Sequence, residues 1–317
     1  MSMSSILVTT WGNGLFNVTG KIVRQELAGQ SFRSLVADGR GGVLAIVGGH
    51  SLCRRSSDGA WTEIAKSEFD LSCCVPIGDG AFVGTDDAHI LRIDREEKQQ
   101  RLTGFDAVAG RDKWYAGSAI IDGKRVGPPL GIRSMAATCD GAVLLANVHV
   151  GGIPRSTDAG LTWQPTIDIE SDVHQVCTRP TRPDIVIAAA GVGLCMSRDA
   201  GMTWTIEQRG LHAHHCSAVA FGRNDIFVSA AESPFATEGA VYRRPIDSNG
   251  ALQPVAGGMP KWTSGSADTN CIATRDSMVA LIDRSGRLYV TNDDGTSWSF
   301  LFDLSDRQIV PSGLYIC

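Results

Sequence analysis

The stretch Ser156-Thr157-Asp158-Ala159-Gly160-Leu161-Thr162-Trp163 returns as Ser197-Arg198-Asp199-Ala200-Gly201-Met202-Thr203-Trp204, and again as Thr291-Asn292-Asp293-Asp294-Gly295-Thr296-Ser297-Trp298. A repeat spacing of about 40 residues indicates a fold built from similar supersecondary units. In each copy the aspartate can accept hydrogen bonds from backbone amides of a tight turn, and the glycine can adopt a positive φ. The tryptophan can anchor the strand that follows. Each copy therefore predicts a strand, a turn and a second strand.

A shorter version of the pattern, Ser56-Ser57-Asp58-Gly59-Ala60-Trp61, lacks two residues between glycine and tryptophan, so we expect its turn to differ. The S-x-D-x-G-x-T-W pattern is the Asp-box (BNR) repeat. Through it the chain resembles the family of Asp-box β-propellers, which includes sialidases, sortilin-like ectodomains and photosystem assembly factors. The resemblance implies a propeller with the motif on a hairpin at the rim of a blade. It is a signal of fold rather than of activity.

Strand signals recur along the whole chain as short apolar or β-branched runs bounded by Gly, Asp, Asn and Ser, without a long segment of helical period. Six units are expected: the first opens with strands at 33–37 and 42–47, and the others span 71–102, 132–166, 173–207, 216–255 and 270–302. Strands at 6–10, 14–18 and 21–27 would join residues 309–317 in a seventh. We therefore predict an all-β, seven-bladed β-propeller, with the last blade closed by N- and C-terminal strands; six blades are the alternative. This closure leaves no open sheet edge.

Composition narrows the class of protein. The chain has 317 residues, of which 43% are hydrophobic, enough to bury a large core as one domain, 1–317. A net charge of −5 without a Lys/Arg run disfavours nucleic acid and anionic membranes as partners. The nine cysteines include no C-x-x-C pair, and residues 1–6 do not resemble a secretory signal. We expect a cytoplasmic protein with free thiols.

Histidines are the sharpest functional signal. In a propeller the first strand of each blade begins, and the second ends, at the top of the central channel, where side chains from distant segments converge. Five of the seven histidines occupy such places, namely His50, His149, His174, His214 and His215. Neighbours on a strand alternate faces, so one of His214 and His215 should point inward. We predict that His149, His174, His215 and His50 hold one divalent ion (Zn, Mn or Ca), without a nucleotide cofactor.

Other polar residues also lie at the start of a first strand or at the end of a second strand. Arg33 and Arg133 could bind an anionic substrate group through paired hydrogen bonds, and Glu232 and Asp268 could act as a general base or orient a ligand. A metal-free acid–base site built from His149, His174, His215, Arg133, Arg33, Asp268 and Glu232 is the first alternative. The second is that the histidines simply line a wet channel.

An insertion at about 104–131 joins an outer strand to the next inner strand and carries Trp114 and Tyr115. Such a connection crosses the top face, so it could form a lid or a substrate-binding wall, with Trp262 on another connection. The alternative is a disordered excursion.

Three functions follow from these observations. The first is a hydrolase or lyase acting on a small anionic or ester-type substrate in the channel. The second is a non-catalytic scaffold for a protein partner, similar to photosystem assembly factors. The third is a sialidase-like glycoside hydrolase or carbohydrate binder. The sialidase pattern requires three arginines, whereas this chain offers Arg33 and Arg133.

Overall fold

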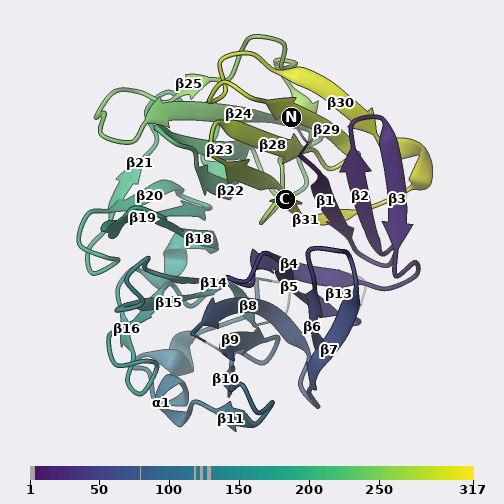
Figure 1. Cartoon of the computed structure of the whole chain (residues 1–317). Coiled ribbons are helices and arrows are strands. Elements are labelled where there is room, and N and C mark those ends of the chain that lie inside the picture. Colours follow the sequence, from purple (N-terminus) through teal and green to yellow (C-terminus); the bar gives the residue numbers. More distant parts are fainter. Residues whose placement is uncertain (1–3, 79, 118, 122–123, 127–129) are drawn as a thin grey trace. The chain divides into compact units, whose positions relative to one another are not determined.

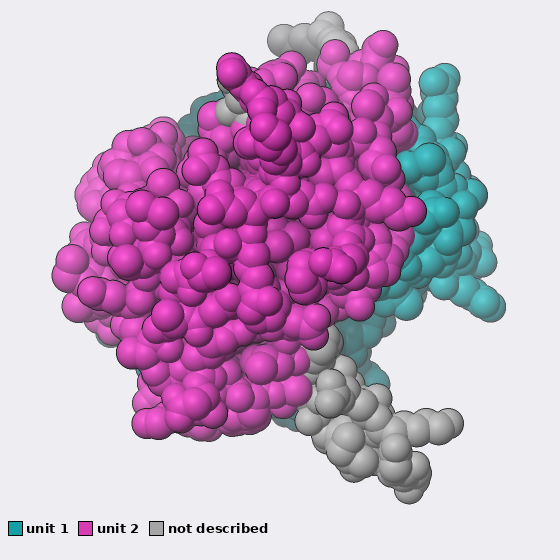
Figure 2. All heavy atoms as spheres, turned by 90° about the horizontal axis from the view of Figure 1, so that it is seen from below, with its two compact units in different colours: residues 1–35, 189–194, 206–317 teal, residues 36–188, 195–205 magenta. Residues whose placement is uncertain are grey.

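The fold is described from a computed structural model of the chain (Figure 1). The structure describes residues 4–78, 80–117, 119–121, 124–126 and 130–317. It divides into two compact units, shown in separate colours in Figure 2. Unit 1 comprises Met1–Leu35, Ala189–Leu194 and Ile206–Cys317, and unit 2 comprises Val36–Ala188 and Cys195–Thr205. No helix in these described ranges is long and apolar enough to cross a membrane.

Unit 1 contains the sheet formed by the two ends of the chain. Its order is β3-β2-β1-β31, with β1 (Ile6–Thr10), β2 (Leu15–Thr19), β3 (Ile22–Glu26) and β31 (Pro311–Ile316). Strands β1 and β31 are antiparallel, and Ile6 lies opposite Ile316. This pairing confirms the predicted closure of one blade by N- and C-terminal strands.

Two further sheets belong to unit 1. One follows the order β22 (His215–Phe221), β23 (Asp225–Ala231), β24 (Glu238–Pro245), β25 (Gln253–Pro254), with β26 (Thr263–Ser264) paired to β24. The other follows β27 (Ile272–Arg275), β28 (Met278–Ile282), β29 (Arg287–Thr291), β30 (Ser299–Asp303), and the turn η3 (Ser305–Arg307) comes after it. Apolar side chains from these sheets, among them Phe227, Leu281 and Trp298, form one buried core.

Unit 2 contains the sheets that carry the candidate site. One has the order β8 (Leu71–Ile77), β9 (Gly80–Thr85), β10 (Ile90–Ile93), β11 (Gln99–Arg101). The next has the order β14 (Ile132–Ala137), β15 (Leu144–Val148), β16 (Pro154–Ser156), β17 (Gln164–Pro165). The predicted insertion lies between them and contains α1 (Thr103–Asp106), η1 (Arg111–Lys113) and the paired strands β12 (Ala119–Ile121) and β13 (Lys124–Val126). Its residues 118, 122–123 and 127–129 lie outside the described part.

The remaining two sheets have the orders β4 (Phe32–Ala37), β5 (Val43–Val47), β6 (Ser51–Arg55), β7 (Trp61–Lys66), and β18 (Val173–Arg179), β19 (Arg182–Ala190), β20 (Gly193–Ser197), β21 (Thr205–Glu207). In every blade except the one that joins the chain ends, the strand order follows the sequence order. The described residues thus form seven sheets with a four-stranded path, which confirms the all-β, seven-bladed propeller class and rules out six blades.

The Asp box fixes the turn between the third and fourth strands. Asp158 Oδ1 accepts a hydrogen bond from the Thr162 backbone N–H at 2.9 Å, and Ser156 Oγ accepts one from the Gly160 N–H at 2.9 Å. Gly160 has a φ of 87°, and the Trp163 indole donates to its carbonyl oxygen at 2.9 Å. The boxes that precede β21 and β30 repeat the carboxylate-to-amide contacts.

The shortened box forms a different turn, as expected. Asp58 accepts from the Ala60 N–H at 3.3 Å, and the Gly59 N–H donates to the Ser56 carbonyl at 2.9 Å. Because the two missing residues bring the next strand closer, the carboxylate caps a tighter loop here.

Replacing the box tryptophan should cost stability. Trp163 is 6% exposed, and its ring lies edge-on to Phe105 with centroids 5.1 Å apart. Trp163→Ala should therefore lower the free energy of unfolding by about 3–5 kcal/mol, measured by urea denaturation. The matched control is Leu161→Ala in the same box, since Leu161 is 70% exposed. Equal losses in the two variants would contradict this role of the tryptophan.

Acid should weaken these turns. Hydrogen bonds from Thr162 lower the pKa of Asp158 to about 2, and those from Ser297 and Thr291 lower the pKa of Asp293 to about 2. In the unfolded chain both carboxyls titrate near 3.9. Their contribution is complete above about pH 4 and is lost as the pH falls towards 2. The urea midpoint should drop over this range, and it should drop less in Asp158→Asn/Asp293→Asn. An identical pH profile in that variant would exclude the two carboxylates as its cause.

Candidate metal-binding site

Two of the predicted histidines meet inside unit 2. His149 follows β15 directly, and His174 is the second residue of β18, which packs against β14 and β15 (Figure 1). His149 is 4% exposed and His174 is 3% exposed. Their ring centroids lie 5.6 Å apart, with the planes inclined by 45°. The strand ends therefore bring together two imidazoles that are 25 positions apart in the chain.

A carboxylate that the sequence reasoning missed lies between these rings. Asp172 Oδ1 is 3.2 Å from His149 Nε2, and Asp172 Oδ2 is 3.3 Å from His174 Nε2. Asp172 ends the one-turn helix η2 (Ile169–Ser171) and adopts a left-handed conformation with φ of 51°. All three potential ligand atoms lie within 4.8 Å of one another. The pattern that could have revealed it is an aspartate two residues before a histidine at the start of a strand.

Arg133 approaches the same histidine. The register of β14 against β15 shifts between Ile132 and Ser134, so Arg133 is the extra residue of a β-bulge. A bulge redirects the side chain of the extra residue. Arg133 Nη1 lies 3.1 Å from His149 Nε2. Because guanidinium groups only donate, Nε2 accepts in this contact, and the ring proton then sits on Nδ1.

The protonation of the cluster suits a cation. Burial lowers the pKa of His149; the contact with Asp172 opposes this shift, and the charge of Arg133 adds to it. Burial alone would raise the pKa of Asp172, but its contacts with His149 and His174 outweigh burial and hold that pKa well below the usual range. A neutral imidazole beside an ionised carboxylate is the state in which these side chains bind metals.

One atom left without a partner also fits a metal. Asp172 Oδ1 is buried and has no hydrogen bond within the described residues, whereas the unpartnered His149 Nδ1 carries the ring proton and is not a ligand atom in this tautomer. An unpartnered carboxylate oxygen 3.2 Å from an imidazole nitrogen has the spacing of two ligands on one small cation. Two nitrogens and one oxygen favour Zn²⁺ or Mn²⁺, whereas Ca²⁺ takes oxygen ligands. Calcium, one of the three ions expected from sequence, fits this donor set poorly.

The other two predicted histidine ligands are not part of this group. His50 lies in the turn after β5, where Nδ1 contacts the Phe69 carbonyl at 3.1 Å and Nε2 lies 3.4 Å from Asp70. His215 begins β22 in unit 1. Among the described residues, the group of potential ligands contains His149, Asp172 and His174.

The remaining predicted polar residues also belong to unit 1. Arg33 lies in β4, with its guanidinium 4.9 Å from the ring centre of Trp11. Glu232 directly follows β23, and Asp268 precedes β27, where its carboxylate accepts from the Thr269 N–H at 2.7 Å. Arg33 and Glu232 lie at the strand ends that the sequence predicted, and Asp268 lies four residues before its strand. Since they belong to unit 1, we include none of them in the site of unit 2.

The three predicted substrate-binding aromatics have different surroundings. Trp114 is 7% exposed and packs against Phe105 at a centroid distance of 5.7 Å, so its ring forms core and not a binding surface. Its burial also shows that the insertion is packed at this point. Tyr115 is 48% exposed, and its hydroxyl donates to Glu170. Trp262, in unit 1, is half-buried against His212.

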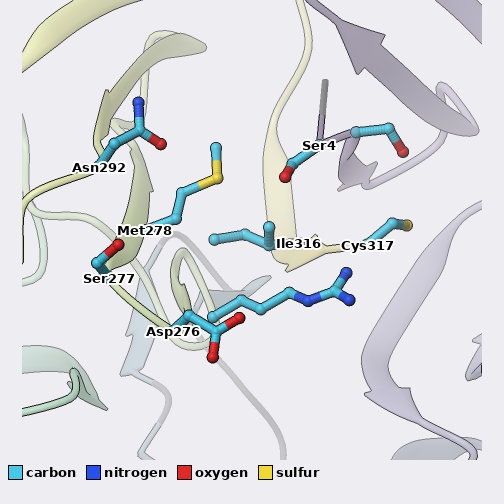
Figure 3. Close-up of a pocket in the computed structure, with 9 residues that line it drawn as sticks. Ser4, Asp276, Ser277, Met278, Asn292, Ile316 and Cys317 are labelled. Atoms are coloured by element: carbon cyan, nitrogen blue, oxygen red, sulfur yellow. The ribbon is translucent and has the colours of Figure 1, made fainter. Parts of the chain in front are cut away.

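A separate pocket lies within unit 1 (Figure 3). Its volume is about 620 Å³, and Met278, Asn292, Ile316 and Cys317 are among its lining residues. None of the predicted site residues lines it. We assign it no function.

Comparisons with known proteins support the fold. No family profile matches the sequence, and no curated protein matches it. The structure is similar to a putative 6-phosphogluconolactonase from Bacteroides uniformis (TM-score 0.64, 11% identity, 100% of both chains). It is also similar to YCF48 bound to D1 peptide (TM-score 0.57, 13% identity, 89% of this chain and 91% of that chain).

A third similar structure is the GH74 enzyme of Niastella koreensis, with a TM-score of 0.60 and 10% identity over 95% of this chain. The chain spans about half the length of that enzyme, 47%. Identities this low show a shared fold alone. The protein is thus a seven-bladed β-propeller whose fold resembles those of a putative 6-phosphogluconolactonase, a GH74 enzyme and YCF48.

Proposed function

We propose that the protein is a metal-dependent hydrolase or lyase acting on a small anionic or ester-type substrate. His149, Asp172 and His174 would hold the metal. The observation that carries this proposal is the buried pair of imidazoles with an ionised carboxylate between them, all three ligand atoms within 4.8 Å. The unpartnered Asp172 Oδ1 supports it further, because a buried acceptor without a partner costs stability unless a ligand satisfies it.

Each side chain has a distinct role in this proposal. A divalent ion held there supplies Lewis-acid polarisation of a carbonyl or phosphoryl oxygen. Arg133 Nη1 lies 3.1 Å from His149 Nε2, so its positive charge would face a substrate bound beside the metal. A guanidinium can offer a substrate carboxylate or phosphate two parallel hydrogen bonds. Arg133 would thus give the site its preference for anions.

A second candidate is a peptide-binding scaffold. The similarity to YCF48, solved with a peptide, favours it, since the alignment covers 89% of this chain. Tyr115 and Arg133 would then contact the peptide, and no bond would be broken. A scaffold requires no metal, so metal binding distinguishes the two candidates.

Removing a ligand should abolish metal binding. Wild-type protein should bind one Zn²⁺ or Mn²⁺ by isothermal titration calorimetry, and His149→Ala or His174→Ala should weaken binding by about 100-fold or more. His50→Ala is the matched control, because His50 also follows the second strand of its blade but pairs with Asp70. The proposal would be overturned if wild-type protein bound no metal. It would also be overturned if all three variants lost metal binding to the same extent.

Changing Arg133 should separate metal binding from substrate binding. Arg133→Gln removes a positive charge 3.1 Å from a ligand atom, so metal affinity should rise roughly ten-fold, equal to about 1.4 kcal/mol. For anionic esters or lactones, kcat/KM should fall by about 100-fold. Arg133→Lys keeps the charge and should leave metal affinity near that of wild type. A parallel loss of metal affinity and turnover in Arg133→Gln would contradict the assigned role.

A further inference from the structure

The insertion is attached to the chain beside the metal-binding cluster. Trp114 is buried against Phe105, which anchors the segment in the core of unit 2. The next residue, Tyr115, donates its backbone N–H to the Val150 carbonyl at 3.2 Å. Val150 directly follows His149. The segment 114–117 is therefore held against one of the three potential ligands.

The Tyr115 side chain reaches the turn that carries a second potential ligand. Its hydroxyl donates to Glu170, 3.1 Å from Oε2 and 3.3 Å from Oε1. Glu170 is the middle residue of η2, and its backbone N–H donates to the Asp168 carboxylate at 2.9 Å. The Asp172 N–H donates to the Ile169 carbonyl at 3.3 Å at the other end of the turn. Tyr115 thus ties the insertion to the turn that presents Asp172.

The turn needs this support because Asp172 adopts φ of 51°. A left-handed conformation is unfavourable for a residue other than glycine, and it persists only where the surroundings enforce it. Its two carboxylate oxygens must also each face a different imidazole. A small rotation of η2 would remove one oxygen from its histidine.

Gly117 performs a similar task for His149. A Cβ at position 117 would lie 1.9 Å from His149 Cε1 and 2.2 Å from Nδ1. The backbone of Gly117 therefore lies directly on the ring, and no larger residue fits unless the imidazole moves. Its contact limits the plane in which His149 can present Nε2.

We infer that Tyr115 and Gly117 are positioning residues of the metal-binding cluster: Tyr115 sets Asp172 through Glu170, and Gly117 sets the ring of His149. This inference rests on the proposed function, since it assigns the insertion to the same site. Residues 114–117 of the insertion would then form a fixed wall of the site.

The test combines a double-mutant cycle with amide hydrogen exchange. Tyr115→Phe and Glu170→Ala should each weaken Co²⁺ affinity about ten-fold and change the visible absorption spectrum of the Co²⁺ protein. The double variant should be no weaker than either single variant, because both remove the same link. Glu170→Gln keeps an acceptor for the hydroxyl and should restore near wild-type affinity. In metal-free protein, Tyr115→Phe should speed exchange at the Ser171 and Asp172 amides about ten-fold.

Gly117→Ala should weaken Co²⁺ affinity more than Tyr115→Phe does, whereas Gly250→Ala should not change it. The control is chosen because a Cβ at position 250 would meet only Ser248 Oγ within 4 Å. Additive losses in the cycle, or unchanged exchange at Asp172 in Tyr115→Phe, would overturn the inference. If wild type binds no Co²⁺, the proposed function is wrong, and the exchange measurement in metal-free protein still decides whether Tyr115 holds Asp172.

Discussion

The shared carboxylate of Asp172 is the interaction on which the candidate site depends. The imidazoles of His149 and His174 are almost fully buried, and buried polar groups need polar partners. The half-buried carboxylate of Asp172 faces both of them. Contacts with the two rings keep the pKa of Asp172 low, so the carboxylate stays ionised. Its oxygens can therefore serve as ligands for a cation bound between the imidazoles. Arg133 donates a hydrogen bond to His149 Nε2 at 3.1 Å. Tyr115 of the insertion forms hydrogen bonds with Val150 and Glu170, which are close in sequence to His149 and Asp172.

Most of the fold could be predicted from sequence because its signals are local. The Asp box specifies a turn through the hydrogen bond accepted by the Asp158 carboxylate and through the positive φ of Gly160. Both features arise within a segment of eight residues. Strand runs bounded by turn residues located the sheet that begins at His215 and ends at Pro254 to within a residue or two. The pairing of Ile6 with Ile316 is not local. It could be predicted only because both termini were left without partners once six units had been assigned.

The site was predictable only where it follows from strand ends. His149 lies at the end of the second strand of its blade, and His174 lies at the start of the first strand of its blade. Their positions could therefore be derived from the strand pattern. Asp172 lies in a left-handed residue after a one-turn helix, a conformation that composition does not indicate. The burial of Trp114 depends on Phe105, and the placement of Gly117 depends on the path of an insertion without periodicity. Contacts of this kind arise from tertiary packing.

The most direct test of the account is a crystal structure of the protein soaked with Zn²⁺, with anomalous diffraction recorded on both sides of the zinc absorption edge. The account predicts one strong peak about 2.0–2.2 Å from His149 Nε2, His174 Nε2 and an oxygen of Asp172. A zinc peak elsewhere, with both imidazoles still paired to Asp172, would contradict it.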